Sequence, residues 1–234
     1  MIEPRKRDRP LYLLAWYRSI QHITTAIWMV RGGIRCSGAH HIPDHGGALL
    51  VSNHLSHLDV FFLGLPLNRP LNYVARSTLF IPVLGPLIRS VGGFAIQRDG
   101  RGAQGLKETL KRLKSGAIVT IFPEGTRSVD GELGEIKAGV AILASRAKVP
   151  IVPAALAGSF ESWPRGVSFP KAHPVHIHYG RGIQPQELEG LDLEAITNLI
   201  RERILDCQRE ARRQLAFRWG SEDDRRATGP TGRI

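Results

Sequence analysis

The chain has 234 residues, 42% of them hydrophobic, which is enough for one domain with a sizeable core. Its two cysteines, Cys36 and Cys207, lie far apart, so a disulfide framework and a cysteine metal motif are excluded and a reducing compartment is favoured. The formal net charge of +11 predicts attraction to a polyanion, which can be nucleic acid, an anionic membrane surface or a phosphorylated substrate.

The N-terminal segment, residues 1–33, has a basic start, "MIEPRKRDRP", and then an aromatic, apolar stretch. Arg18, Gln21 and His22 interrupt that stretch, so it falls short of about 20 consecutive apolar residues, and no small-residue cleavage site marks a signal peptide. We expect an amphipathic helix on a membrane surface, with Trp16 and Trp28 as interfacial anchors. A helix packed on the domain's own core and a full membrane span are the alternatives.

Short apolar segments then alternate with amphipathic ones over residues 34–219. The expected elements are, in chain order, a strand at 47–54, a helix from 58 that stops near Pro66, strands at 71–76 and 93–99, a helix at 105–116, a strand from 117 to Pro123, a helix at 137–148, strands at 149–156 and 174–180, and a helix from about 188 to 219. This alternation predicts a single α/β domain. The polar, Gly-rich stretch 220–234 is expected to be a disordered tail.

The stretch "VSNHLSHLDV", residues 51–60, places several polar groups between two apolar segments. His54 and Asp59 would point about 140° apart on one helix, but they can meet if His54 lies in the turn and Asp59 in the first helical turn beyond it. A carboxylate then fixes the tautomer of the imidazole, which can accept a proton from a hydroxyl. Ser56 and Asp59 also fit a helix capping box, and both interpretations can hold together. A third interpretation is a metal site made by His54, His57 and Asp59.

Four motifs within residues 35–180 carry a resemblance. The order and spacing of "NHLSHLD", "GGFAIQRD", "FPEGTRS" and "VPIVPAAL" resemble those of the 1-acylglycerol-3-phosphate acyltransferase (lysophosphatidic acid acyltransferase) family, within the broader glycerolipid acyltransferases. Arg76 departs from the pattern because relatives frequently have lysine there, so a planar fork replaces a point charge. The resemblance implies an α/β fold with a mixed sheet flanked by helices, and an N-terminal membrane-associated helix.

The resemblance also implies the roles of single residues. His54 would be the general base and Asp59 its partner, and the acceptor's phosphate and glycerol would be bound by Arg98, Glu124, Gly125, Thr126 and Arg127. Arg76 and Lys137 are further candidates for substrate binding. A phosphate dianion favours planar guanidinium groups, and glycine lets backbone approach a ligand closely. Glu124 is expected to orient Arg127 or to accept a hydroxyl.

No G-x-S-x-G motif is present and neither cysteine has a neighbouring base, so a direct transfer without an acyl-enzyme is expected. The donor would be a thioester of coenzyme A or acyl carrier protein, the acceptor a lysophospholipid, and no metal or redox cofactor is needed. The other expected partner is an anionic membrane surface, without nucleic acid, and the expected location is the cytoplasmic face of a membrane, peripheral or monotopic.

Three alternatives remain at this point. A lyso-aminolipid or another lysophospholipid can replace 1-acylglycerol-3-phosphate as acceptor. "GRGAQG", residues 100–105, fits the dinucleotide pattern G-x-G-x-x-G, with Glu124 about 20 residues further on, although three polar residues separate the strand from its first glycine. A basic protein that coats anionic membrane without chemistry would also carry this charge, but it would not need the His54–Asp59 pair.

Overall fold

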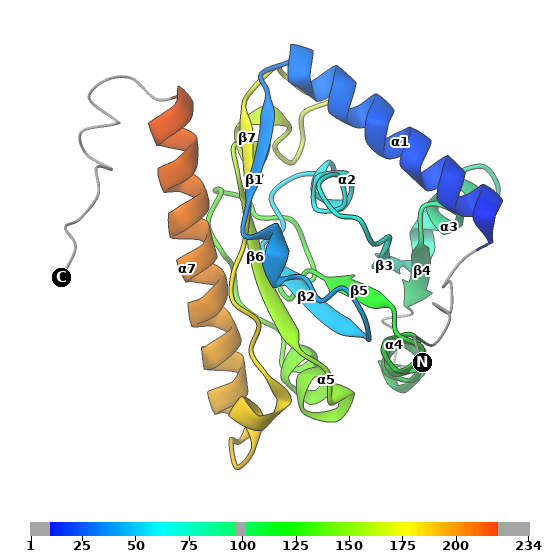
Figure 1. Ribbon diagram of the computed structural model, residues 1–234, viewed down its shortest axis with the longest axis vertical. Coiled ribbons are helices and arrows are strands. Elements are labelled where there is room, and N and C mark those ends of the chain that lie inside the picture. The colour runs from blue at the N-terminus through cyan, green and yellow to red at the C-terminus, as the bar shows by residue number, and fades with distance from the viewer. Residues whose placement is uncertain (1–9, 97–101, 220–234) are drawn as a thin grey trace.

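The computed structural model describes residues 10–96 and 102–219, which form an α/β fold around one seven-stranded sheet (Figure 1). The strands are β1 (Ile34–Ser37), β2 (Ala48–Ser52), β3 (Leu71–Arg76), β4 (Gly93–Ile96), β5 (Ile118–Ile121), β6 (Ile151–Ala157) and β7 (Val175–Tyr179). The helices are α1 (Leu11–Val30), α2 (Asp59–Phe62), α3 (Leu84–Ser90), α4 (Gly102–Lys114), α5 (Gly139–Ala147), α6 (Ser159–Ser162) and α7 (Leu193–Trp219). Short 3₁₀ turns lie at Ala39–His41, Ser77–Leu79 and Pro185–Leu188.

The sheet has the strand order β1-β7-β6-β2-β5-β3-β4. All neighbouring strands pair in parallel except β6 and β7, so the sheet is mixed as predicted. Every residue of β2, β5 and β6 is buried, which is what strands covered by helices on both faces require. The five parallel strands β6, β2, β5, β3 and β4 end at the same edge, where ligands bind in open α/β sheets.

Two apolar layers cover the sheet, one on each face. One layer packs the sheet against α4, α5 and α7, and the other packs it against α1 and α2. The long helix α7 contributes Ile196, Ile200 and Ile204 at helical spacing, and all three are fully or almost fully buried. Leu193, at the start of α7, is 45% exposed.

The N-terminal helix α1 packs one face on the domain and presents the other outward. Gln21 is buried and donates to the carbonyls of Gly64 and Leu67, so one of the polar residues that interrupt the apolar stretch serves the contact with the domain. The expectation for Trp28 is wrong, because its ring is 4% exposed and packs edge-to-face against Phe62 with the ring centroids 4.9 Å apart. Trp28 is a core residue and cannot act as an interfacial anchor.

Membrane contact by α1 is therefore possible only through its outer face. That face carries the exposed apolar side chains Leu11, Tyr12, Trp16, Ile23, Ile27, Met29 and Val30. Among the residues that the structure describes, no helix combines the length and the apolar character needed to cross a bilayer. The segments 1–9 and 220–234, for which we expected a basic start and a disordered tail, lie outside the described residues.

The predicted strands are confirmed close to their expected bounds, and the differences have local reasons. The helix expected from residue 58 to Pro66 is a single turn, α2, because the chain after Phe62 tightens into i to i+3 hydrogen bonds around Gly64. Strand β1 was missed because it is a four-residue edge strand whose side chains are mostly outside the core. Helix α3 was missed because Gly85 and Pro86 occupy its first turn, where proline is nevertheless tolerated.

Candidate active site

Three loops converge at the carboxyl edge of the parallel strands. Strand β2 continues into Asn53 and His54, β5 into the loop 122–128, and β6 into the segment 158–165 that contains α6. The side chain of Asn53 extends the pairing of β2 with β6, since its Nδ2 donates to the carbonyl of Leu156 and its Oδ1 accepts from the Leu156 amide. The turn that carries His54 is thus anchored to the sheet.

His54 and Asp59 meet as predicted. His54 Nδ1 lies 2.9 Å from Asp59 Oδ2, and the Asp59 side chain is fully buried while 19% of the His54 side chain is exposed. Because an ionised carboxylate can only accept, Nδ1 donates the hydrogen and Nε2 is left with its lone pair. The pair therefore has the tautomer that a general base needs.

The same carboxylate oxygen closes the turn between β2 and α2. Asp59 Oδ2 also accepts from the backbone amides of Leu55, at 2.6 Å, and Ser56, at 2.7 Å, while Ser56 Oγ accepts from the Leu58 amide at 3.2 Å. Of the expected capping box, only the bond from the Ser56 amide to the Asp59 carboxylate is present: α2 is preceded by Leu58 and has no side-chain cap, and the Asp59 amide donates to the Ser56 carbonyl rather than to its hydroxyl. One carboxylate both shapes the turn and orients the imidazole.

The loop after β5 holds the backbone of His54 from the other side. Glu124 Oε1 accepts from the His54 amide at 2.9 Å and Oε2 accepts from the Gly134 amide at 3.0 Å, and the Ser128 amide donates to the His54 carbonyl at 2.7 Å. The ring of Phe122 stacks on the His54 imidazole with centroids 4.0 Å apart. Gly125 has φ +69°, a conformation that favours glycine at this sharp turn.

Glu124 thus has a role that its motif did not predict. The residue is 4% exposed and both carboxylate oxygens accept backbone hydrogen bonds, so Glu124 positions His54 and the loop that contains Gly134. Burial raises the pKa of the Glu124 carboxyl, and the amides of His54 and Gly134 act in the opposite direction. A dinucleotide site would need this acidic group free to bind a ribose, but both of its oxygens already accept backbone hydrogen bonds. Gly102 and Gly105 of "GRGAQG" lie within α4 rather than in a turn before it. These observations disfavour the dinucleotide interpretation.

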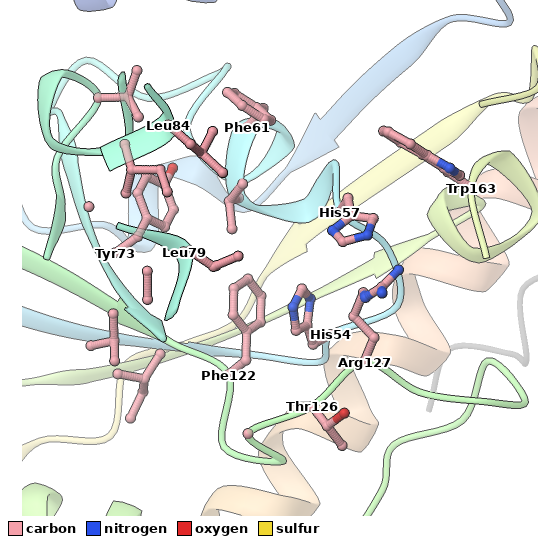
Figure 2. Close-up of a pocket in the computed structure, with 18 of the residues that line it drawn as sticks. His54, His57, Phe61, Tyr73, Leu79, Leu84, Phe122, Thr126, Arg127 and Trp163 are labelled. Atoms are coloured by element: carbon pink, nitrogen blue, oxygen red, sulfur yellow. The ribbon is translucent and has the colours of Figure 1, made fainter. Parts of the chain in front are cut away.

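A cavity of about 810 Å³ begins at His54 and extends beneath α1 and α3. Figure 2 shows its two ends: His54, His57 and Arg127 group at one, and Phe61, Tyr73, Leu79 and Leu84 line the other. Ile20 of α1 and Ile88 of α3 also line the apolar part. The cavity therefore joins a polar, cationic end to a long apolar end, as an amphipathic ligand requires.

The other predicted site residues differ in how closely they approach this cavity. Gly125, Thr126 and Arg127 line it, whereas Glu124 and Lys137 line a smaller adjoining cavity of about 290 Å³ that shares Thr126 and Arg127. Lys137 is largely exposed and lies 3.8 Å from Glu135. Arg76 ends β3 at the same edge of the sheet, but its side chain is outside the described part of the structure. Arg98 lies within residues 97–101, which are outside it as well.

Three further residues at the polar end of the cavity were not predicted from the sequence. His57, which we considered from the sequence only as a metal ligand, lines the cavity and contacts the ring of Trp163 edge-to-face with centroids 5.3 Å apart. Burial lowers the pKa of His57, and the charge of Arg127 lowers it further. Trp163 and Arg165 come from the segment after β6, where the sequence offers no motif. Within residues 10–96 and 102–219, no three metal-ligating side chains cluster.

Comparisons with known proteins place this arrangement in a family. The model of the Acyltransferase family matches residues 33–157. The chain is 36% identical to a chloroplastic 1-acyl-sn-glycerol-3-phosphate acyltransferase of Arabidopsis thaliana over 57% of this chain and 38% of that protein. It is 31% identical to the 1-acyl-sn-glycerol-3-phosphate acyltransferase of Bacillus subtilis over 61% of this chain and 71% of that protein. The chain thus spans well under half the length of the plant relative and about seven tenths of the bacterial one.

The fold has a counterpart among solved structures. The crystal structure of the 1-acyl-sn-glycerophosphate (LPA) acyltransferase PlsC from Thermotoga maritima superposes with a TM-score of 0.73, covering 87% of this chain and 83% of that one at 23% identity. The predicted α/β architecture is confirmed by this likeness. The chain belongs to the Acyltransferase family, as the four motifs indicated.

We predict that Glu124→Gln destabilises the fold by about 1–3 kcal/mol, because an amide can accept from only one of the two backbone N–H groups that Glu124 now satisfies. Urea unfolding measures this change. Glu135→Gln is the matched control, since the Glu135 side chain is 85% exposed and its loss should change the free energy of unfolding by less than about 0.5 kcal/mol. Equal effects of the two substitutions would contradict the role given to Glu124.

Proposed function

We propose that this protein transfers a fatty acyl group from a thioester donor to the free hydroxyl of 1-acylglycerol-3-phosphate and so forms phosphatidic acid. Family membership supports acyl transfer, and the relatives named above are 1-acyl-sn-glycerol-3-phosphate acyltransferases. The observation that carries the proposal is the His54–Asp59 pair, which lies at the polar end of a cavity of about 810 Å³ whose other end is apolar. A lysophospholipid with a larger head group, or a lyso-aminolipid, is the second candidate acceptor.

The proton transfer follows from the tautomer of His54. Nε2 accepts the proton of the acceptor hydroxyl as the oxygen attacks the thioester carbonyl, and Asp59 stabilises the imidazolium that forms. The tetrahedral intermediate then collapses with cleavage of the C–S bond. The departing thiolate takes the proton back from His54, so that an ester and a free thiol leave and the imidazole is neutral again. Coenzyme A and acyl carrier protein both present such a thiol.

In this proposal the phosphate of the acceptor binds at the cationic end of the cavity. Arg127 lines that end together with Gly125 and Thr126, and its planar guanidinium can hold two phosphate oxygens. In this proposal Arg98, two residues beyond the end of β4, and Arg76, at the end of β3, act on the same phosphate. Lys137 adds charge from the adjoining cavity. Glu124 acts as a positioning residue, because it holds the backbone of His54 at the end of the cavity where the phosphate would bind.

The apolar end of the cavity suits an acyl chain. Phe61, Leu79 and Leu84 line it, and it runs beneath α1 and α3, whose outer surfaces are also apolar. Trp16 of α1 donates to Ser90 of α3 at 3.0 Å, which joins the two helices over the cavity. A lipid tail would thus lie directly under the part of the surface that meets the bilayer.

Membrane association at the cytoplasmic face completes the proposal. Further exposed apolar residues lie on α3 and on the segment that leads into it: Leu79, Ile81, Val83, Leu84 and Leu87. An apolar surface of this kind on a chain with a net charge of +11 fits an anionic leaflet that the protein enters from one side. Substrate and product are lipids, so a protein on the surface reaches both without leaving the membrane.

We expect His54→Ala to lower the turnover of acyl thioester with 1-acylglycerol-3-phosphate by about 10²–10⁴-fold, because the general base is lost. Binding to lipid vesicles should remain, since His54 is not on the exposed apolar surface. His45→Ala, in an exposed loop, is the control and should keep full turnover. A His54→Ala protein that still consumed the thioester at the normal rate would refute the catalytic proposal and favour a membrane-coating protein.

The double substitution Tyr12→Ser/Val30→Ser should weaken binding to anionic vesicles by about tenfold or more, because two side chains that are 71% and 88% exposed no longer bury apolar area in lipid. Vesicle sedimentation measures the affinity, and thermal unfolding in the absence of lipid should be unchanged. Leu191→Ser/Leu193→Ser, at the far end of the molecule near the start of α7, is the matched control. If the two double variants bound alike, α1 would not be the membrane contact.

A further inference from the structure

Two arginines from different loops meet at the boundary of the two cavities. Arg127 belongs to the loop after β5 and Arg165 to the segment after β6. Both line the large cavity that contains His54 and also the smaller cavity that contains Lys137. β5 and β6 are the two neighbours of β2, the strand that leads to His54, so the loops that carry the two arginines start on either side of that strand.

Neither guanidinium has a carboxylate partner in the part of the chain that the structure describes, residues 10–96 and 102–219. Several other arginines do have one: Arg112 pairs with Glu108, Arg212 with Glu132 and Arg213 with Glu210. Burial lowers the pKa of Arg127, and the charge of Arg165 lowers it further, so the two cations repel each other. Two uncompensated cations held together in a cavity form a site for an anion with two charges.

The backbone around Arg165 is held in place. Trp163 Nε1 donates to the carbonyl of Val167 at 2.7 Å, and the Lys171 amide donates to the Ser162 carbonyl at 2.7 Å, which closes the loop on itself. The Trp163 ring then rests against His57, three residues after the general base. This contact ties the loop that carries Arg165 to the turn that carries His54.

We infer that Arg165 binds the phosphate of the acceptor jointly with Arg127, and that this pair selects a phosphate monoester. A monoester dianion offers two charges and three oxygens to two guanidinium groups, whereas a phosphodiester head group offers one charge and carries a substituent. The inference rests on the proposed function and refines its acceptor. It makes Arg165 a specificity residue that lies outside the four sequence motifs, in the segment that follows the last of them.

Steady-state kinetics of Arg165→Ala and Arg165→Lys test this assignment. For Arg165→Ala, the KM for 1-acylglycerol-3-phosphate should rise about 10–100-fold, which is the loss of a charge-assisted contact, while kcat and the KM for the acyl thioester stay within about twofold. Glycerol 3-phosphate, which has no acyl chain, should lose potency as a competitive inhibitor by the same factor. Arg165→Lys should recover part of the affinity, because a point charge replaces the fork. Arg181→Ala, on an exposed loop after β7, is the control and should change none of these constants.

The outcomes separate the inference from the proposed function. A raised KM for the acyl-CoA donor with an unchanged KM for the acceptor would overturn the inference and assign Arg165 to the phosphates of coenzyme A. Unchanged constants in Arg165→Ala would overturn it outright. If the wild-type protein ignores 1-acylglycerol-3-phosphate, the proposed function fails, and calorimetric binding of glycerol 3-phosphate to the wild type and to Arg165→Lys still decides the anion site: equal affinities refute it and a weaker Arg165→Lys complex supports it.

Discussion

The carboxylate of Asp59 is the constraint on which the site depends. One of its oxygens accepts from the His54 ring and from two backbone amides, and the side chain is fully buried. Burying a charge is costly unless hydrogen bonds compensate it, and here the three donors that stabilise the charge are also the groups that must be held in place. The turn, the tautomer and the direction of the imidazole are therefore set by one group. Removal of this acceptor oxygen would release all three together.

The sheet supplies the second half of the arrangement. Parallel strands end on one edge, so residues far apart in sequence arrive beside His54 on the loops after β5 and β6. Glu124 and Ser128 bind the backbone of His54, and Asn53 ties the same turn to β6. The site is thus built on the most deeply buried strands, which suits a proposed reaction that requires an oxygen nucleophile and a thioester to meet in one geometry.

Much of the fold could be predicted because its local signals are strong. The runs of β-branched and aliphatic residues in β2, β5 and β6 have the length and composition of buried strands, and His54 and Asp59 could be paired because five residues separate them across a predicted turn. The predictions that were wrong or missing concern residues whose environment depends on tertiary packing. Trp28 has the sequence context of an interfacial anchor but packs on Phe62 in the core. Glu124 reads as a ligand-binding residue in its motif, yet it accepts bonds from backbone amides of two distant segments. Arg165 belongs to no motif, and only the folding of the loop after β6 brings it to the cavity.

The most direct test of the account is the kcat of Asp59→Asn with saturating acyl thioester and 1-acylglycerol-3-phosphate. The amide oxygen of the asparagine must stand where Asp59 Oδ2 stands, because the Leu55 and Ser56 amides donate to that position, so His54 keeps its tautomer. The negative charge that stabilises the imidazolium is lost, which weakens His54 as a base. We predict that kcat falls by about 10²–10⁴-fold while the KM values for both substrates stay within about threefold. A folded Asp59→Asn protein that kept a kcat within threefold of the wild type would contradict the claim that this carboxylate makes His54 the general base.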